Sequence, residues 1–249
     1  MMIAIVGDLH LGRTVAGYDA TPDVLSAWAE VVEDAAEAGA SLLVQAGDVF
    51  DTSSPTPELT ALAIGLLGDA ASRFRHGAVV LVGNHDLRHG VDRLDALAPM
   101  TAAARLSDSR LSVVGVPSAF AFEDAPGSPV VLALPYESRS RRAWRDAVEY
   151  DAAIVDALGA TTGPIVVVGH LDVEGARLGS EMIARGGGHP WPTGRGWVER
   201  VRVAVDGHYH APQTVRTGPW SIECVGSLAR LDFGEATDRK RFVIVDVGT

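Results

Sequence analysis

The sequence has only one cysteine, Cys224, among its 249 residues. An intramolecular disulfide is therefore excluded, and so is a structural zinc site built on a set of cysteine ligands. Scarcity of cysteine is typical of a reducing compartment, which predicts a cytoplasmic location. Cys224 lies in a predicted strand, where we expect it to be a small buried hydrophobic residue.

Long hydrophobic runs and targeting signals are also missing. The longest apolar runs, such as "PIVVVG" and "PVVLALP", fall far short of the ~20 residues that a membrane-spanning helix needs. The opening residues "MMIAIVGDLH" include no basic leader and no small-residue cleavage site, so no signal peptide is expected. With 47% hydrophobic residues, the composition predicts a folded protein with a substantial core and no membrane association.

The chain lacks an excess of basic residues, and its formal net charge is −11 at pH 7. Proteins that bind nucleic acids usually have a basic face, so this balance counts against DNA as a partner. However, metal ions neutralise the carboxylates that bind them, and a metal centre can be the largest local positive charge. The acidic balance therefore weakens a nucleic-acid function without excluding it.

In the first half of the chain, apolar runs of strand length alternate with amphipathic helical stretches. We expect strands over residues 3–6, 41–45 and 78–82, separated by helices over residues 23–38 and 58–74. This rhythm predicts an α/β fold whose parallel strands are joined by right-handed crossovers. The strands are apolar throughout, as expected when both faces of a sheet are covered.

The second half predicts shorter strands and one helix, over residues 141–158. Turn residues link the later strands, which predicts a largely antiparallel second sheet. No low-complexity linker or repeat separates the halves, so we expect one domain over residues 1–249 with two stacked sheets, and a long loop over residues 178–196. The expected strands cover residues 111–114, 130–134, 165–168, 201–205, 214–216, 222–225 and 242–247.

Five short polar motifs each follow a predicted strand. One such motif is typical of an ordinary turn with a hydrogen-bonded histidine, but turn formation alone does not explain five of them. Ligands of open α/β sheets bind at the carboxyl ends of strands, where these motifs lie. The motifs are "GDLH" with Asp8 and His10, "GDVFD" with Asp48 and Asp51, "GNHD" with Asn84, His85 and Asp86, "GH" with His170, and "DGHYH" with His208 and His210.

The side chains of these motifs are suited to binding metal ions. They offer carboxylate, amide and imidazole donors without cysteine, a mixture that suits Mn²⁺, Fe²⁺ or Zn²⁺ and is large enough for two ions. Residues two apart at a strand end can point into the same pocket, and the glycine before each motif would leave room for metal and substrate. Two ions ~3.5–4 Å apart can stabilise both the attacking and the leaving oxygen of a displacement at phosphorus.

Together these motifs resemble the complete set of the calcineurin-like metallophosphoesterases, in the same order and over residues 8–210. The flanking segments "DLHLGR", "AGDVFDTSSPTP", "GHLDVEGARLGSEMIARGG", "GSLARLDFGE" and "DRKRFVIVDV" further resemble the SbcD-type DNA repair exonucleases. These are nuclease subunits that work with an SMC-like coiled-coil ATPase. The resemblance implies a four-layer α/β/β/α sandwich of two mixed sheets flanked by helices.

The resemblance also implies a role for each motif residue. His85 would face the scissile phosphate, Asp86 would orient His85, and Asp51 would support the metal ligands. The implied nucleophile is a hydroxide that bridges the two ions. The implied ligands are Asp8, His10, Asp48 and His210 for one ion, and Asp48, Asn84, His170 and His208 for the other.

Further expectations concern substrate and partners. The resemblance implies Mn²⁺, 3′-to-5′ action on duplex DNA ends, an SbcC-type ATPase partner and a homodimer. Members of this type carry a DNA-binding capping domain and a C-terminal docking segment, so a chain that stops at Thr249 is expected to be either the phosphoesterase core alone or a truncated or minimal phage-like form. Arg88 and Arg177 follow two ligand motifs and are candidates for phosphate contacts, whereas Trp191 and Trp197 either stack on bases or pack beneath the long loop.

Two other functions stay open at this point. A phosphoesterase of the same fold could act on a cyclic nucleotide, a phosphoprotein or another small phosphate ester, which suits the acidic charge and the missing capping domain. The third interpretation is a non-catalytic scaffold. The presence of every implied ligand together with His85 argues against it.

Overall fold

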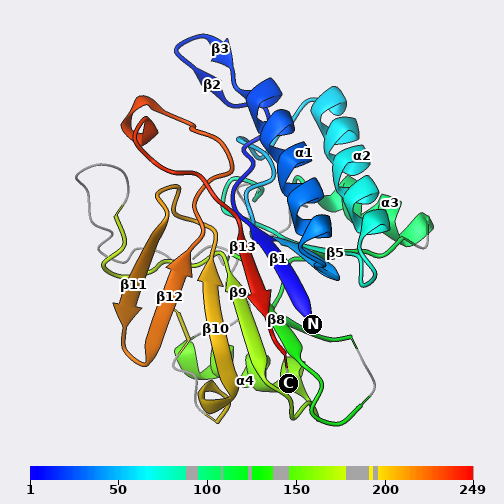
Figure 1. The fold of residues 1–249 in the computed structure, drawn as a ribbon, viewed down its shortest axis with the longest axis vertical. Helices are drawn as coiled ribbons and strands as arrows, with labels where there is room; N and C mark the ends of the chain where they lie inside the picture. Colours follow the sequence, from blue (N-terminus) through cyan, green and yellow to red (C-terminus); the bar gives the residue numbers. More distant parts are fainter. Residues whose placement is uncertain are drawn as a thin grey trace.

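Two β-sheets stack face to face, and helices cover their outer faces (Figure 1). The structure is a computed structural model that describes residues 1–87, 95–107, 109–122, 125–136, 146–177, 191–192 and 196–248. The arrangement confirms the four-layer α/β/β/α sandwich of two mixed sheets. None of the helices in these residues is long and apolar enough to cross a membrane.

The first sheet contains the predicted β-α-β-α-β unit. Four of its strands are parallel, and the last strand of the chain pairs antiparallel with the first one. Helices on its outer face are α1 (Thr21–Glu37), α2 (Pro57–Arg73) and α3 (Ala98–Leu106). The strand order is β13 (Val243–Asp246), β1 (Met2–Val6), β4 (Leu42–Gln45), β5 (Ala78–Leu81) and β6 (Leu111–Val114).

The second sheet is not largely antiparallel, and that prediction was wrong. Its four central strands run parallel, and only the two edge strands are antiparallel to their neighbours. Apolar residues fill both faces, because α4 (Ala147–Leu158) packs on one and the first sheet on the other, which is the usual environment of parallel strands. The strand order is β11 (Gln213–Thr217), β12 (Trp220–Cys224), β10 (Val201–Asp206), β9 (Ile165–Gly169), β8 (Val130–Leu134) and β7 (Ser118–Ala121).

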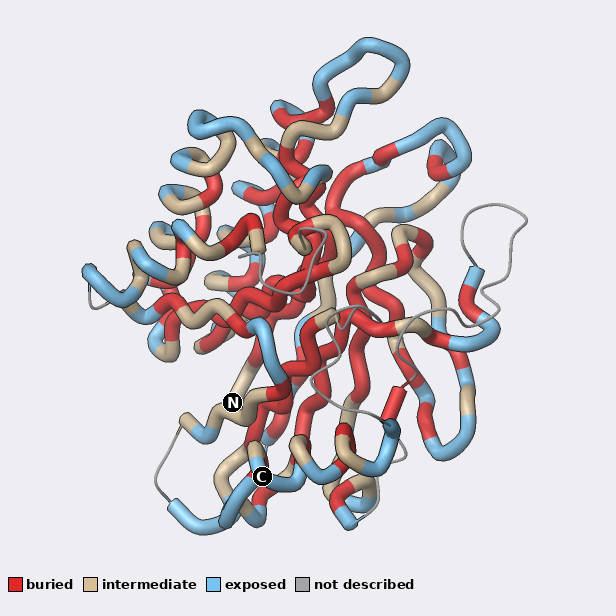
Figure 2. Tube along the Cα trace, turned by 180° about the vertical axis from the view of Figure 1, so that it is seen from behind, coloured by how far each residue is buried: buried red, intermediate tan, exposed pale blue. Residues whose placement is uncertain are grey.

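Three hydrophobic layers hold the sandwich together, and Figure 2 shows buried strands between exposed outer surfaces. The layer between the sheets consists largely of Val, Ile, Leu and Ala side chains. Beyond the second sheet, Trp191 and Trp197 are only 7% and 1% exposed and contact Trp220, which confirms packing in place of base stacking. Cys224 is fully buried in the same layer, as predicted.

Polar side chains mark where two of the helices begin. The Thr56 hydroxyl accepts the backbone N–H of Leu59 at 3.3 Å at the start of α2. The Asp146 carboxylate accepts the N–H groups of Val148 and Glu149 at 2.9 and 3.0 Å at the start of α4. Such caps satisfy N–H groups that have no partner within the helix, so each helix starts where its cap residue lies.

Several short elements were not predicted, because they are too short for a reliable hydrophobic period. The predicted start of α4, at residues 141–145, and most of the loop predicted over residues 178–196 lie outside the described residues. The one-domain organisation stays a prediction. The elements missed are α3, β7, the hairpin of β2 (Thr14–Val15) and β3 (Tyr18–Asp19), and the 3-10 turns η1 (Val198–Arg200) and η2 (Phe233–Glu235).

Candidate metal centre

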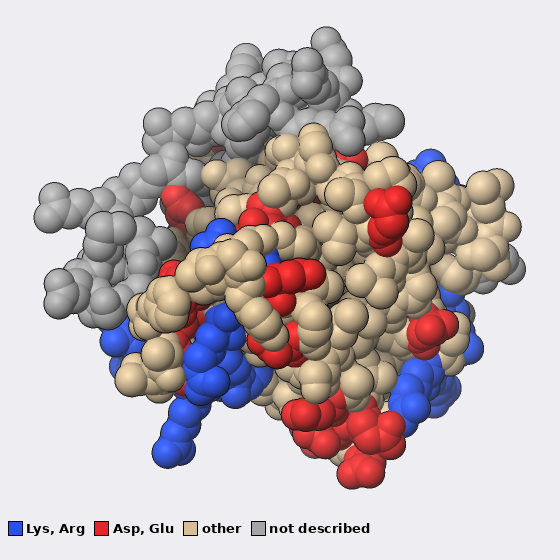
Figure 3. Space-filling view, turned by 90° about the horizontal axis from the view of Figure 1, so that it is seen from above, with Lys and Arg blue, Asp and Glu red and all other residues tan. Residues whose placement is uncertain are grey.

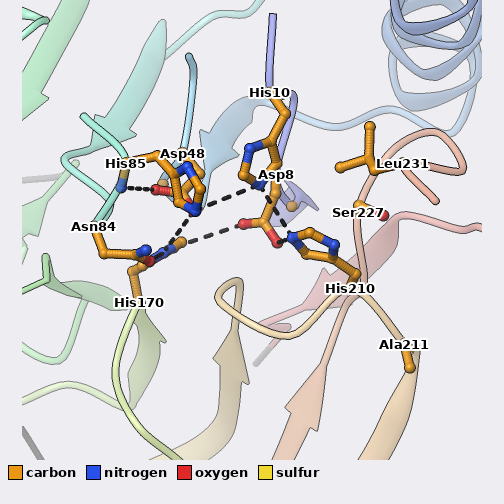
Figure 4. Close-up of polar contacts among 12 residues, drawn as sticks. Asp8, His10, Asp48, Asn84, His85, His170, His210, Ala211, Ser227 and Leu231 are labelled. Atoms are coloured by element: carbon orange, nitrogen blue, oxygen red, sulfur yellow. Dashed lines mark hydrogen bonds and ion pairs between the residues drawn. The ribbon is translucent and has the colours of Figure 1, made fainter. Parts of the chain in front are cut away.

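The polar motifs meet where β1, β4, β5, β9 and β10 end, and Figure 4 shows most of this cluster. Backbone hydrogen bonds tie the first two loops together, since the N–H groups of Leu9 and His10 both donate to the Asp48 carbonyl at 3.0 Å. His10 and Asp48 adopt left-handed backbone angles, with φ of 46° and 54°. Such angles are costly for residues other than glycine and concentrate at functional sites.

One group of donors consists of Asp8, His10 and His210, whose ligand atoms lie within 4.8 Å of one another. The Nε2 atoms of the two histidines face each other at 3.1 Å, and His210 Nε2 lies 3.9 Å from Asp8 Oδ2. Both Asp8 oxygens are buried and have no hydrogen-bond donor among the described residues. Buried carboxylate oxygens without donors are costly unless a cation is close, so this group has the unmet negative charge expected of a metal site.

A second group consists of Asp8, Asp48 and His170, so Asp8 belongs to both groups. The ligand atoms of this group also lie within 4.8 Å of one another. His170 Nδ1 donates to the Ala46 carbonyl at 2.7 Å, so in the neutral ring Nε2 keeps its lone pair. That Nε2 lies 3.0 Å from Asn84 Oδ1 and 3.4 Å from Asp48 Oδ2. Asp48 Oδ2 also lies 3.5 Å from His10 Nε2, so a single oxygen stands between the two groups.

His85 lies at the edge of the cluster. Its ring packs edge-on against His10, with centroids 4.7 Å apart, and its backbone N–H donates to Asp48 Oδ1 at 2.8 Å. Its Nδ1 lies 2.8 Å from the Asp51 carbonyl, which can only accept, so Nδ1 carries the hydrogen. A ring nitrogen of His85 also comes within 4.8 Å of donor atoms of His10 and Asp48. Its assignment to substrate in place of metal stays a prediction.

Asp86 is fully buried and holds the "GNHD" loop against the loop that follows β4. Its carboxylate accepts the backbone N–H groups of Gly83, Phe50 and Val49 at 2.9, 3.0 and 3.3 Å. The ring of His85 donates its Nδ1–H to the Asp51 carbonyl of that neighbouring loop, and no described hydrogen bond joins the ring to Asp86. In the described contacts, Asp86 therefore acts on the loop backbone. That it orients His85, as the resemblance implied, stays a prediction.

His208 lies beside His170, with ring centroids 5.0 Å apart, and outside the two donor groups. Its Nε2 lies 3.1 Å from Asp172 Oδ1. Its Nδ1 is buried and has no hydrogen-bond partner in the part of the chain that the structure describes. Nδ1 is therefore the nitrogen that His208 could offer to a metal ion.

Carboxylates contact the outer nitrogens of three of the predicted histidine ligands. Asp51 Oδ1 lies 3.2 Å from His10 Nδ1, and Glu235 Oε1 lies 2.8 Å from His210 Nδ1; the third carboxylate is Asp172. Only Asp51 was predicted. The spacing in "HLD" repeats that of Asp-x-His and could have indicated Asp172, whereas Glu235 follows its histidine by 25 residues without a local signal.

Buried carboxylates dominate the electrostatics of the cluster. Burial disfavours the charged form of His170, but Asp48 and Asp8 outweigh it and raise its pKa to about 10. Burial and the nearby Asp48 raise the pKa of Asp86 to about 7, and burial raises the pKa of Asp206, at the end of β10, well above its usual range. This negative field fits divalent cations held by oxygen and nitrogen ligands, and so do the Asp8 oxygens, which no donor in the described part of the chain contacts.

The sequence predicted that the motif glycines leave room for metal and substrate. Two of them, Gly83 and Gly47, instead leave room for a neighbouring loop that carries a proposed ligand. A Cβ atom at Gly83 would lie 2.1 Å from Asp48 Oδ1 and 2.2 Å from Asp48 N. At Gly47, where φ is 99°, a Cβ atom would lie 2.2 Å from His170 Nδ1. The absence of side chains at these positions allows the ligand loops to approach one another.

We expect Gly83→Ala to destabilise the metal-free protein by about 3 kcal/mol or more, because an added Cβ would overpack the Asp48 loop. Gly65→Ala is the matched control, since a Cβ there meets nothing within 4 Å. In a helix interior this control should gain about 0.5–1 kcal/mol. Urea unfolding of the metal-free variants measures both changes, and equal stability of the two would contradict the close approach.

Of the two arginines predicted to contact phosphate, the structure describes only Arg177. Arg88 lies outside the described residues. Arg177 is exposed, and its backbone N–H donates to Gln213 Oε1 at 2.8 Å. Arg13, which was not predicted, reaches the site, with Nη1 3.3 Å from Asp51 Oδ1. In the view from above, described acidic side chains lie near the middle and Lys and Arg gather in separate groups (Figure 3), so the visible part of this face is not continuously basic.

The sequence is similar to two kinds of DNA-processing protein. It is 27% identical over 269 residues to the SbcD subunit of the SbcCD nuclease of Bacillus subtilis (strain 168), a match that covers 99% of this chain and 66% of that protein. It is 29% identical over 110 residues to "DNA double-strand break repair protein Mre11" of Methanopyrus kandleri, which covers 43% of this chain and 23% of that protein. The chain thus spans less than two thirds of the length of these relatives.

A dimetal phosphatase from Danio rerio has a similar fold, with a TM-score of 0.53 at 11% identity, over 92% of this chain and 88% of that chain. Such low identity shows a likeness of fold alone. The calcineurin-like phosphoesterase family matches residues 1–212, a range that includes all five motifs and every strand that positions them. The protein therefore belongs to the calcineurin-like phosphoesterase family.

Proposed function

We propose that this protein is a two-metal phosphodiesterase that hydrolyses DNA, as an SbcD-like nuclease of DNA repair or recombination. Its family supports hydrolysis of phosphoric esters. The observation that carries the two-metal part is the position of Asp48 Oδ2, which lies 3.5 Å from His10 Nε2 and 3.4 Å from His170 Nε2. One carboxylate oxygen placed between two sets of donors is the arrangement expected of a shared ligand.

The donors divide around this oxygen. The group of Asp8, His10 and His210 supports one ion position, and the approach of His170 Nε2 to Asn84 Oδ1 and Asp48 Oδ2 supports the other. His208 joins the second position through its Nδ1, which has no hydrogen-bond partner among the described residues. The proposed ligands are Asp8, His10, Asp48 and His210 for one ion, and Asp48, Asn84, His170 and His208 for the other.

When bound, two divalent ions would neutralise charge on the phosphate and supply a deprotonated water near neutral pH. His85 is the residue that would move the leaving-group proton. Because the Asp51 carbonyl engages the Nδ1–H of His85, Nε2 is the nitrogen that faces the substrate, and in the imidazolium form of the ring it can donate its proton to the leaving 3′ oxygen. The three backbone hydrogen bonds of Asp86 keep the loop that carries His85 in place.

Similarity to relatives supports DNA as the substrate. The match to the Bacillus subtilis nuclease extends over 99% of the chain, and the second relative is named for double-strand break repair. The first relative is named as one part of a larger nuclease, which supports an SbcC-type ATPase partner. Mn²⁺ as the native metal, a homodimer and a cytoplasmic location stay predictions.

The direct test is an assay of the purified protein with Mn²⁺ on linear duplex DNA, single-stranded DNA and bis-p-nitrophenyl phosphate. We expect all hydrolysis to require the metal and to stop when a chelator is added, because no residue alone replaces the charge that the ions supply. DNA should be cleaved in the same metal range as the small diester. DNA cleavage that persists after complete metal removal would contradict the two-metal mechanism.

One observation favours a second candidate, a phosphoesterase that acts on a cyclic nucleotide, a phosphoprotein or another small phosphate ester. The net charge of −11 gives the chain no general attraction for a polyanion. Turnover of the small diester without cleavage of either DNA, even when an SbcC-type ATPase is added, would favour this candidate.

A further inference from the structure

The two histidines of the "HYH" segment contact carboxylates through opposite ring nitrogens. His210 presents Nδ1 to Glu235 Oε1 at 2.8 Å, whereas His208 presents Nε2 to Asp172 Oδ1 at 3.1 Å. In each ring, the other nitrogen is left for the ligand cluster. His210 Nε2 lies 3.1 Å from His10 Nε2, and His208 Nδ1 is buried without a described partner. A carboxylate on one nitrogen fixes the tautomer and the direction of the other.

We propose that Glu235 and Asp172 are positioning residues that each serve one ion of the centre, Glu235 through His210 and Asp172 through His208. The inference rests on the two-metal centre proposed above and adds to it a separate support for each ion. Two neighbouring histidines with opposite tautomers can direct their free nitrogens to different ions. The carboxylates would therefore set the affinity of each ion separately.

Glu235 is part of a compact buried network. It is 3% exposed, and its Oε2 accepts the Leu231 N–H at 2.9 Å, the Ser227 hydroxyl at 3.3 Å and Lys240 Nζ at 2.7 Å. Lys240 Nζ also donates to the His210 carbonyl at 2.9 Å, so the network holds both the backbone and the ring of that histidine. Glu235 and Lys240 lie beyond residue 212, where the family match ends.

Asp172 is held in a different way. The Tyr209 hydroxyl accepts the Val173 N–H at 3.0 Å and donates to the Val173 carbonyl at 3.3 Å. Tyr209 is 2% exposed and lies between the two histidines of the segment, so this contact pins the backbone next to Asp172 against the loop that carries His208. In the described contacts, this support shares no residue with the Glu235 network, which is why we expect the two to act independently.

The test uses the full chain in metal-free form, as wild type, Glu235→Gln and Asp172→Asn, and titrates each with Mn²⁺ by calorimetry. Glu235→Gln should weaken one of the two binding steps by about 10–100-fold, the usual effect of losing such a partner, and leave the other within about 3-fold. Asp172→Asn should weaken the other step. Electron paramagnetic resonance should then show an isolated Mn²⁺ in each variant under conditions where the wild type holds a coupled pair.

Double variants show which histidine each carboxylate acts through. Adding Glu235→Gln to a His210→Ala variant should cause no further loss, whereas adding it to His208→Ala should cause its full loss. Glu235→Gln removes the negative charge that pairs with the Lys240 ammonium group, and this loss can destabilise the fold. The double variant Glu235→Gln with Lys240→Met removes both charges and should weaken the same binding step. Circular dichroism checks that each variant is folded.

Weakening of the same step by both carboxylate variants, or of neither step, would overturn the proposal. Binding is measured without nucleic acid. A wild type that binds two ions but cleaves no DNA would therefore contradict the proposed function and leave this result standing.

Discussion

Replacing His85 with alanine is expected to lower the turnover of DNA by about 10²–10⁴-fold, the usual contribution of a general acid or base, while both metal ions stay bound. The ring is held through Nδ1 by the Asp51 carbonyl at 2.8 Å, which leaves Nε2 for the substrate. The contact at 2.8 Å between the His85 backbone N–H and Asp48 survives the substitution. Turnover at saturating substrate and bound manganese per chain, measured on the same sample, test both parts.

His76→Ala is the matched control, because His76 lies outside the motifs and its ring packs against Phe122 with centroids 5.2 Å apart. It should keep wild-type turnover. If His85→Ala loses one ion together with its activity, His85 is a metal ligand. The distances allow this, because a ring nitrogen of His85 lies within 4.8 Å of donor atoms of His10 and Asp48. Survival of activity would show that His85 transfers no essential proton.

Asp48→Asn is expected to weaken the binding of both ions and to lower turnover by about 10³-fold or more, because it removes the charge shared between the two donor groups. Burial disfavours the ionised form of Asp48, but His170 and His10 outweigh it and hold its pKa below the usual range. The residue is therefore a carboxylate before metal arrives. Asparagine keeps the shape and an oxygen acceptor for the His85 N–H, so the fold should persist.

Thermal unfolding provides a measure of this loss that is independent of activity. An ion that binds only the folded protein stabilises it by about 2.7 kcal/mol at 100 times its Kd, so Mn²⁺ should raise the melting temperature of the wild type. The same Mn²⁺ concentration should hardly change that of Asp48→Asn. Asp34→Asn, at an exposed position of α1, should respond like the wild type. An Asp48→Asn protein that binds two ions with unchanged affinity would refute the shared-ligand role.

The local pattern of residues was enough to predict most of the elements and to place the motifs. Continuous apolar runs predicted β1, β4, β5 and β9, because a strand buried on both faces needs no polar residues. The pairing of strands in the second sheet was not predictable in this way. Turn residues do form the hairpin of β11 and β12, but whether β10 runs parallel to β9 and β12 depends on crossovers that no local signal records.

The candidate ligands were predicted from the sequence, because carboxyl ends of parallel strands meet at one edge and residue type is visible in the chain. What surrounds them was not. The contact of Glu235 with His210 spans 25 residues and depends on the path of the chain after β12. The opposite tautomers of His208 and His210 follow from their carboxylate partners, Asp172 and Glu235. Glycine is needed at position 83 because a Cβ atom there would lie 2.2 Å from the backbone nitrogen of Asp48. A sequence records which donors exist, whereas their direction and spacing come from groups far along the chain that only folding brings into contact.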